Sequence, residues 1–312
     1  GAKYFWQVSA SDGINEPVQS EVGTFTVTNS PVGNRYLFVR NIGGNNVIMS
    51  ANDEGEEHQL TTENRNSFKP VRNVAADRIA YLQSTGAQVD IFTMKRDGTD
   101  HFKVTSNIRP NGFDLNEISI DWPRNSDYIY FANMDKLYRV RSSGQGLELL
   151  YQTSDGSLIS EMAVSERRDI IVLKTNNLDG YDVEIYTINF AGERLHTILS
   201  NVTGAANSVS LSEQSLKIIY TYDISGSTSW DYRRWDSRIY MYDVSTGNTV
   251  DLSPNKDVGT NDLEVRFSPN EAAVIFTNTS NDGISERFVY SLNIQDMKRK
   301  LLFSDAFMPD WR

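Results

Sequence analysis

One segment of the 312-residue chain gathers the side chains best suited to binding a ligand. The run 223–238 reads DISGSTSWDYRRWDSR and holds five of them within six positions: Trp230, Tyr232, Arg233, Arg234 and Trp235. Tryptophan, tyrosine and arginine contribute much of the binding energy at protein interfaces. Aromatic faces also stack on sugar rings, and arginine pairs with carboxylates in a bidentate manner. The segment therefore predicts recognition of a protein or a glycan.

The same segment has a structural alternative, in which it folds back and its tryptophans plug the mouth of a central channel. The sequence leaves both interpretations open. Two shorter segments supply candidates for the same surface, Asp179 with Tyr181 and Asp282 with Glu286. Their NNLDGYD and NDG motifs carry oxygen ligands that suit calcium. Asn, Asp and Gly are also the residues of tight turns, and we favour the turn interpretation.

Catalytic chemistry has no comparable set of residues. His58, His101 and His196 fall in three different repeats of the chain, so we expect no shared transition-metal site. No nucleophile elbow, phosphate-binding loop or dinucleotide motif occurs. No spacing selects a pair of carboxylates for glycoside chemistry. We therefore expect no catalytic residue, no metal and no cofactor.

A repeat must position these segments. Six runs rich in β-branched and aromatic residues recur along the chain: RYLFVR (35–40), RIAYLQ (78–83), YIYFAN (128–133), IIVLKT (170–175), KIIYTY (217–222) and AVIFTN (273–278). Each is followed by another strand, a turn with Gly or Asp, and a short outer strand. The turn glycines from Gly55 to Gly247 recur at intervals of 43 to 55 residues. Four strands at this period predict the blades of a β-propeller.

The two ends of the chain are expected to meet in one blade. An inner strand precedes each later run, as in ISIDWPRN (118–125), whereas the first unit lacks one. The last residues, MPDWR (308–312), resemble this inner strand, so we expect them to complete the first blade. The result is an all-β, six-bladed propeller of four-stranded blades with no open edge. We expect the inner-strand aromatics to pack between blades: Trp122, Phe267 and Trp311.

Residues 4–27 depart from the repeat. YFWQVSASDG, a polar loop and SEVGTFTV read as one β-hairpin that resembles the final two strands of a fibronectin type III or related immunoglobulin-like domain. Because a lone hairpin is barely stable, we expect Phe5, Trp6 and Phe25 to pack against the propeller. The alternative is a decorated first blade. The chain thus divides into a partial fibronectin type III-like hairpin and linker (1–30) and a propeller (31–312).

The repeat also resembles a known family. FSPNEAAVIFT (267–277), SLNIQDMKRKLL (291–302) and IFTMKRDGTDHFKVT (91–105) are similar to the repeat of TolB-like propellers, and the outline of the resemblance covers residues 35–312. The resemblance implies a bacterial protein of the periplasm or cell surface. It further implies that the protein binds protein partners or serves as a module beside an enzyme.

Composition narrows the classes of function. The formal charge of −11 repels phosphate backbones, so we expect no nucleic-acid partner. The chain has no cysteine, which excludes disulfides and thiolate metal sites, and no stretch is apolar enough to cross a membrane. We expect a monomer that is periplasmic, secreted or at the bacterial cell surface, with any targeting segment outside this sequence.

These observations predict a non-catalytic module that binds a protein or a glycan through the 223–238 loop. Two alternatives remain open. One is a polysaccharide-active enzyme, a lyase or glycosidase that uses loop carboxylates. The other is a structural spacer beside the fibronectin-like unit.

Overall fold

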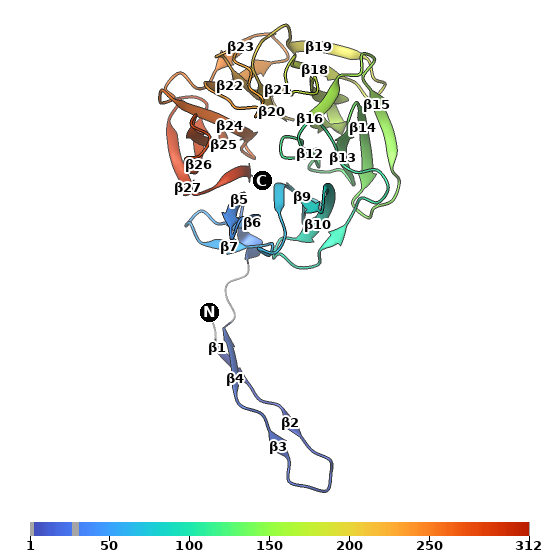
Figure 1. Ribbon diagram of the computed structural model, residues 1–312, viewed down its shortest axis with the longest axis vertical. Helices are drawn as coiled ribbons and strands as arrows, with labels where there is room; N and C mark the ends of the chain where they lie inside the picture. The colour runs from blue at the N-terminus through green and yellow to red at the C-terminus, as the bar shows by residue number, and fades with distance from the viewer. Residues whose placement is uncertain (1–2, 27–30, 312) are drawn as a thin grey trace.

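Six four-stranded antiparallel sheets surround a central axis in this protein (Figure 1). The computed structural model describes residues 3–26 and 31–311. The strands of each sheet follow one another in order, so each sheet is one blade. The predicted all-β, six-bladed propeller of four-stranded blades is confirmed. Among the described residues, no helix has the length and apolarity needed to span a membrane.

The blades are numbered around the ring and given from the inner strand outward. Blade one holds β28 (Phe307–Trp311), β5 (Tyr36–Ile42), β6 (Asn45–Ala51) and β7 (Glu57–Gln59). Blade two holds β8 (Ser67–Asn73), β9 (Arg78–Thr85), β10 (Gln88–Lys95) and β11 (Phe102–Lys103). Blade three holds β12 (Ile120–Asp121), β13 (Tyr128–Asn133), β14 (Lys136–Arg141) and β15 (Glu148–Gln152).

The remaining blades follow the same order. Blade four holds β16 (Leu158–Ser165), β17 (Ile170–Asn176), β18 (Glu184–Ile188) and β19 (Arg194–Leu199). Blade five holds β20 (Ala206–Leu211), β21 (Lys217–Asp223), β22 (Ser237–Asp243) and β23 (Thr249–Asp251). Blade six holds β24 (Thr260–Phe267), β25 (Ala273–Ser280), β26 (Arg287–Asn293) and β27 (Arg299–Ser304). Two 3-10 turns, η1 (Pro31–Gly33) and η2 (Glu166–Arg168), precede β5 and β17.

In several blades, a Thr or Ser that follows the outer strand fixes this strand to the third strand. Its hydroxyl accepts the backbone N–H of a residue of the third strand. The bonds are Thr61 Oγ1 to Ile48 N (2.9 Å), Thr105 Oγ1 to Ile91 N (3.0 Å) and Ser253 Oγ to Ile239 N (2.9 Å). All three hydroxyl-bearing residues are buried, so each hydroxyl satisfies an amide that water does not reach.

The C-terminal strand closes the ring, as predicted. β28 pairs with β5 in an antiparallel ladder that sets Asp310 opposite Leu37 and Trp311 opposite Tyr36. Apolar clusters fill the spaces between neighbouring blades, and Trp122 lies fully buried in one of them. Phe267 is buried in another cluster. Trp311 is partly buried, with its ring centroid 5.2 Å from that of Tyr36.

A β-bulge interrupts five of the six inner strands. In four of them the bulge contains a residue with positive φ: Lys69, Ser208, Glu264 and Met308. A bulge leaves ladder groups unpaired, because the extra residue has no opposite number. An inner strand is also unpaired along its axial edge, so further N–H groups outside the bulges face the neighbouring blade, where they find partners.

Side chains link the inner strands of consecutive blades into a closed circuit, here called the inner ring. Five of its junctions are bonds to a backbone N–H: Asp310 Oδ2 to Arg72 (3.0 Å), Asp121 Oδ2 to Val164 (2.7 Å), Glu161 Oε2 to Val209 (3.0 Å), Ser208 Oγ to Glu264 (2.8 Å) and Glu264 Oε2 to Met308 (2.6 Å). At the sixth, Asn73 Nδ2 donates to the carbonyl of Pro123 at 2.7 Å. Every blade boundary is therefore bridged near the axis.

The N-terminal segment forms the predicted hairpin, with β1 (Lys3–Trp6) pairing with β4 (Gly23–Thr26) and β2 (Ser9–Ala10) with β3 (Val18–Gln19). It lies outside the ring in Figure 1 and shares no sheet with blade one. The expectation that its aromatics pack against the propeller is wrong, because Phe5, Trp6 and Phe25 are 52% to 66% exposed. The hairpin covers part of its own surface instead: Tyr4 stacks on Phe25, and the Trp6 indole lies over Gly23.

Asp310→Ala is expected to lower the free energy of unfolding by about 1–3 kcal/mol, because it leaves the buried Arg72 N–H at a blade boundary without its acceptor. Urea unfolding checks this. Asp296→Ala is the matched control, since Asp296 is exposed in the turn of blade six and joins no blades. Equal stabilities of the two variants would contradict the role of the inner ring.

Candidate binding sites at the two ends of the channel

The strand register distinguishes the two ends of the central channel. Inner strands begin beside the loops that join the second and third strands, as the pairing of Leu158 with Asn176 shows for blade four. They end beside the turns that join the first and second strands, where Val164 pairs with Ile171. We call the first side the loop end and the second side the funnel end. All the candidate residues predicted from the sequence lie at the loop end.

A single buried carboxylate closes the neck of the long blade-five loop. Asp223, the last residue of β21, accepts the backbone N–H groups of Trp235 at 2.8 Å and of Asp236 and Ser225 at 3.0 Å. These bonds bring the two ends of the loop together before β22 begins. The residues between them are therefore projected as a compact unit over the loop end.

Tyr232 turns inward from this loop and is buried. Its ring lies 4.9 Å from that of Phe113 and 5.3 Å from that of Tyr181, measured between centroids. Gly180 makes the packing possible, because a Cβ there would lie 2.5 Å from both the Tyr232 and Phe113 rings. Gly180 also has φ of +86°, a conformation that side-chain-bearing residues rarely adopt.

Arg234 turns inward beside Tyr232 and pairs with Glu117, which comes from the segment joining blades two and three. The Arg234 Nη1 to Glu117 Oε1 distance is 2.8 Å, and both side chains are about one-fifth exposed, at 18% and 20%. Asn207 Nδ2 donates to the other oxygen of Glu117. Burial raises the pKa of the Glu117 carboxyl, but Arg234, Lys69 and Lys174 outweigh this effect and hold the pKa below its ordinary value. The carboxylate is thus ionised and engaged.

Lys174 lies beneath this pair, and its side chain has no exposed surface. Its ammonium group donates to Asn176 Oδ1 at 2.8 Å and lies 5.1 Å from the centroid of the Phe113 ring. Burial lowers the pKa of Lys174 to about 8, although Glu161 and Glu117 act in the opposite direction. The interior below the loop end therefore holds a mixed set of charges under an aromatic cover.

The remaining candidates of the blade-five loop face outward. Trp230 is 97% exposed, and Trp235 is partly exposed with the Arg233 guanidinium 4.1 Å from its ring centroid. Arg233 also donates to the carbonyl of Asn281 in blade six. The alternative in which the tryptophans plug the channel is wrong about which residues do so. Tyr232 and Arg234 enter the mouth, whereas Trp230 points away.

The flanking candidates lie where the sequence predicted them, on the loops of blades four and six. Tyr181 is buried, and its hydroxyl accepts the N–H of Ser229 at 2.8 Å, which ties the blade-four loop to the blade-five loop. Asp179 and Asp282 are exposed. Asp282 accepts the N–H groups of Ile284 and Ser285, and Asn177 accepts that of Asp179, so these polar residues shape their turns.

The histidines occupy outer strands of three blades, as expected. His58 lies in β7, His196 in β19, and His101 directly precedes β11. In the described part of the chain, no three His, Asp or Glu side chains are grouped so as to hold a metal ion.

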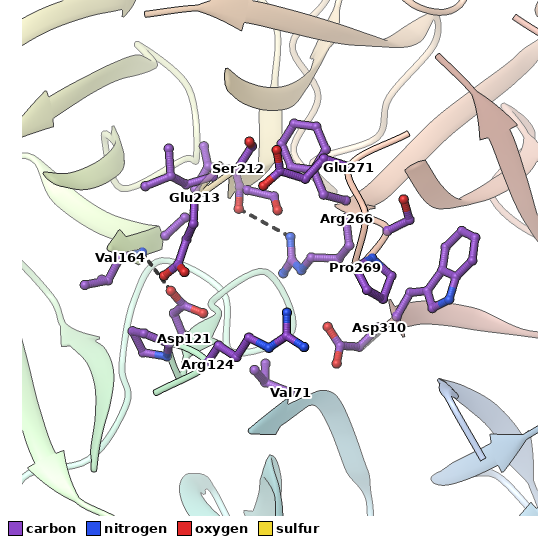
Figure 2. A pocket seen from close by; sticks show the side chains of 18 of the residues that line it. Val71, Asp121, Arg124, Val164, Ser212, Glu213, Arg266, Pro269, Glu271 and Asp310 are labelled. Atoms are coloured by element: carbon purple, nitrogen blue, oxygen red, sulfur yellow. Dashed lines mark hydrogen bonds between the residues drawn. The ribbon is translucent and has the colours of Figure 1, made fainter. Parts of the chain in front are cut away.

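A second candidate site lies at the funnel end, where the sequence predicted no binding residue. A cavity of about 470 Å³ opens there along the axis, and Figure 2 shows the side chains that line it. Its wall is formed by the last residues of the inner strands and the turns that follow, including Val71, Ile120, Val164, Leu211 and Phe267. Charged side chains stand among them: Arg124, Arg167, Arg266, Asp121, Glu213, Glu271 and Asp310.

The repeat held a signal for this site. Arg124 and Glu213 each stand two residues beyond an inner-strand anchor, Trp122 and Leu211, at positions that a propeller turns toward its axis. A comparison of equivalent positions in each unit would have drawn attention to these charges. The long blade-five loop, with its unusual composition, drew attention to the opposite end.

Solved structures share this fold. TolB from Acinetobacter baumannii is similar with a TM-score of 0.68 and 16% identity, over 89% of this chain and 66% of that one. A chain of a nidogen/laminin complex is similar with a TM-score of 0.62 and 11% identity, over 88% of this chain and 93% of that one. An oligogalacturonate lyase in complex with manganese has a TM-score of 0.51 and 11% identity, over 87% and 74%. The likeness is one of fold.

No protein-family model and no curated protein matches the chain. The solved structures show that the chain shares the fold of TolB-like propellers. A fibronectin type III fragment at the N-terminus receives no support. The chain spans just under two thirds of the TolB chain that it resembles.

Arg234→Met is expected to lower the free energy of unfolding by about 1–3 kcal/mol, because it leaves the Glu117 carboxylate largely buried without its cation. Glu117→Gln in the same background should cost much less than Glu117→Gln alone, since the two groups act as a pair. Urea unfolding of the two single variants and the double variant measures the coupling. Additive losses would contradict the pairing.

Lys174→Met tests the buried ammonium through pH. The pKa of Lys174 in the folded chain, about 8, is below its ordinary value of 10.5, so between these values the unfolded chain binds more protons. The stability of the wild type relative to the variant should therefore rise as the pH rises from about 8 to 10.5. Urea unfolding of both proteins across this range gives the difference, and a constant or falling difference would contradict the shift.

Proposed function

We propose that this protein is a non-catalytic propeller module of an exported bacterial protein and that it binds a protein partner at its loop end. The observation that carries the proposal is the exposure of large apolar side chains at the loop tips of three consecutive blades. Leu178 of blade four is 73% exposed, Trp230 of blade five 97% and Ile284 of blade six 91%. Val258, in the segment joining blades five and six, is also fully exposed.

These tips stand on loops that are bound to one another. Ser229 and Tyr181 join the loops of blades four and five, and Arg233 and Asn281 join those of blades five and six. Asn281 N–H also donates to the carbonyl of Gly259, beside Val258. Loops held in this way lose little freedom on binding, which favours affinity. Grouped apolar side chains on a rigid surface are typical of interaction sites.

The charges around these tips indicate the chemistry of the partner. Exposed carboxylates surround the apolar side chains: Asp179, Asp182, Asp231, Asp257, Asp282 and Glu286. Arg233 and Lys256, by contrast, are engaged with Asn281 and Asp236. A partner with an apolar contact surface edged by lysine and arginine would complement this face.

A protein fits the loop end better than a glycan does. Sugar rings stack on open aromatic faces, but the Arg233 guanidinium lies over the Trp235 ring and Tyr232 is buried. Trp230 alone keeps a fully open ring among the five candidates of the loop. A single exposed tryptophan surrounded by other apolar tips suits a protein interface, in which aromatic anchors enter pockets of the partner.

The carboxylates of the loop end are poor candidates for acid–base catalysis. A general acid or base at neutral pH requires a pKa near 7, which burial usually provides. Hydrogen bonds from Ser285 and the backbone of Ile284 and Ser285 instead lower the pKa of Asp282 to about 2. The pKa of Glu117 is also below its ordinary value, and its carboxylate is paired. These properties support the non-catalytic proposal over a polysaccharide-active enzyme.

The wider setting of the module is also proposed. Similarity in fold to TolB supports a periplasmic or cell-surface position. We also propose that the protein is a monomer whose propeller spans residues 31–312. Residues 1–30 would form a separate hairpin and linker. The nidogen/laminin complex illustrates that a propeller of similar fold occurs in a protein–protein complex.

Trp230→Ala is expected to weaken partner binding at least tenfold while leaving the thermal midpoint unchanged, because the side chain is exposed and contributes little to folding. A photoreactive p-benzoyl-phenylalanine at position 230, used in living cells of the source organism, identifies the partner. Titration of the purified partner against the wild type and Trp230→Ala then measures the loss.

Phe102 provides the matched control, since it is an exposed aromatic on the outer strand of blade two. Photoreactive substitution there should give no cross-link to the same partner, and Phe102→Ala should retain full affinity. Equal affinity of Trp230→Ala and the wild type would overturn the site. Quenching of tryptophan fluorescence by a glycan, lost in Trp230→Ala, would replace the protein partner with a carbohydrate, and reaction products would overturn the non-catalytic proposal.

A further inference from the structure

The cavity at the funnel end has a chemistry of its own, independent of the loop end. Among the residues that the structure describes, the charged side chains of its lining are three arginines and four carboxylates, so their summed formal charge is −1. A strongly anionic ligand would meet net repulsion from this wall, and a simple cation would meet the arginines. The near balance of charge instead suits a ligand that carries both signs.

Most of the carboxylates already serve the fold. Asp310 and Asp121 accept backbone N–H groups in the inner ring. Glu271 accepts the N–H groups of Gln214 and Ser215 and the hydroxyl of Ser215. Their oxygens are held by the scaffold. Glu213 differs, because within residues 3–26 and 31–311 no hydrogen bond or ion pair to its carboxylate is formed, and the side chain is partly exposed.

Two arginines keep donors available to a ligand. Arg124 is exposed, and its guanidinium forms no hydrogen bond or ion pair with the described residues. Arg266 donates through Nη1 to the carbonyls of Val209 and Val265, which fixes the side chain across the cavity. Figure 2 shows both guanidinium groups directed toward the middle of the cavity. A carboxylate between them would receive charge-assisted hydrogen bonds from two sides.

We propose that the funnel end binds a small zwitterion, a free amino acid or short peptide, whose carboxylate is held by Arg124 and Arg266 and whose ammonium group faces Glu213. The cavity of about 470 Å³ is within the range of small-molecule sites and admits molecules of this size. Apolar lining from Val71, Ile120 and Val164 would contact the side chain of the ligand.

The site is organised in advance of binding. Arg124 and Glu213 stand on turns directly after inner strands, and the inner ring fixes the relative positions of those strands. The backbone that carries these groups would therefore need little rearrangement, and the Arg124 and Glu213 side chains would become ordered on binding.

Calorimetric titration with the twenty amino acids, Ala-Ala and Ala-Ala-Ala tests the proposal. Binding of at least one of them by the wild type is expected, and Arg124→Gln should weaken it tenfold or more. Arg124→Gln is expected to fold normally because the side chain is exposed and unpaired. Arg141→Gln, an exposed arginine in blade three, is the matched control and should bind like the wild type.

Blocked ligands separate the two charges. N-acetyl-Ala-Ala lacks the ammonium group and Ala-Ala-amide lacks the carboxylate, so each should bind at least tenfold more weakly than Ala-Ala. Glu213→Gln should weaken Ala-Ala but leave the acetylated peptide unchanged. Binding of both blocked peptides as tightly as Ala-Ala would overturn the zwitterion. Absence of binding by every amino acid and peptide would overturn the site.

The outcome is separable from that of the loop end. Trp230→Ala leaves the funnel end intact and should bind the zwitterion like the wild type, whereas Arg124→Gln should bind the protein partner like the wild type. Failure of one proposal therefore leaves the other standing.

Discussion

The structure depends on how the inner strands satisfy their backbone amides. An inner strand pairs along one edge only, so it presents N–H groups that its own ladder cannot pair, and burial of such groups without acceptors is costly. At five of the six junctions, the acceptor comes from a side chain of an adjacent blade, mostly a carboxylate. The same bonds that satisfy these groups also set the spacing between blades. The inner ring therefore also sets the dimensions of both ends of the channel.

The two ends differ because loops, unlike inner strands, are free to vary in length. At the loop end, the segment preceding blade three supplies Phe113 and Glu117, and the blade-five loop supplies Tyr232 and Arg234. These four side chains meet over the axis and cover Lys174. At the funnel end, the turns between first and second strands are short, and the described residues form no such cover over the cavity. Asymmetry of loop length thus gives one covered end and one open end.

The fold could be predicted because its signals are local and repeated. Six strand runs, turn glycines and the likeness of MPDWR to IDWPR predict the number of blades and the closure by β28. The long loop was also recognisable, and Tyr181 and Asp282 were correctly placed beside it. Its internal arrangement was not predictable, because Tyr232 and Trp230 are equally aromatic and only contacts with Phe113, Gly180 and Tyr181 select which one turns inward.

Other parts escaped prediction for related reasons. Glu117 and Arg234 are 117 residues apart, and neither local sequence indicates that the two side chains pair. The cavity at the funnel end is formed by single residues from each blade, so no contiguous motif marks it. Packing of the N-terminal aromatics on the propeller was expected because a lone hairpin is barely stable, yet the hairpin stacks Tyr4 on Phe25 and leaves about half of each of these two side chains exposed.

The inner ring has a mechanical consequence. Its bonds run around the axis from blade to blade and form a closed circuit. Strain at one blade boundary can therefore be passed to the other blades in both directions around the ring. An open row of blades would concentrate the same disturbance at its weakest joint. In blade one, β28 and β5 bring both ends of the propeller sequence into one sheet. Tension applied between the two termini would therefore pull first on that ladder, and the bonds of Asp310 to Arg72 and of Met308 to Glu264 would pass part of the load to blades two and six.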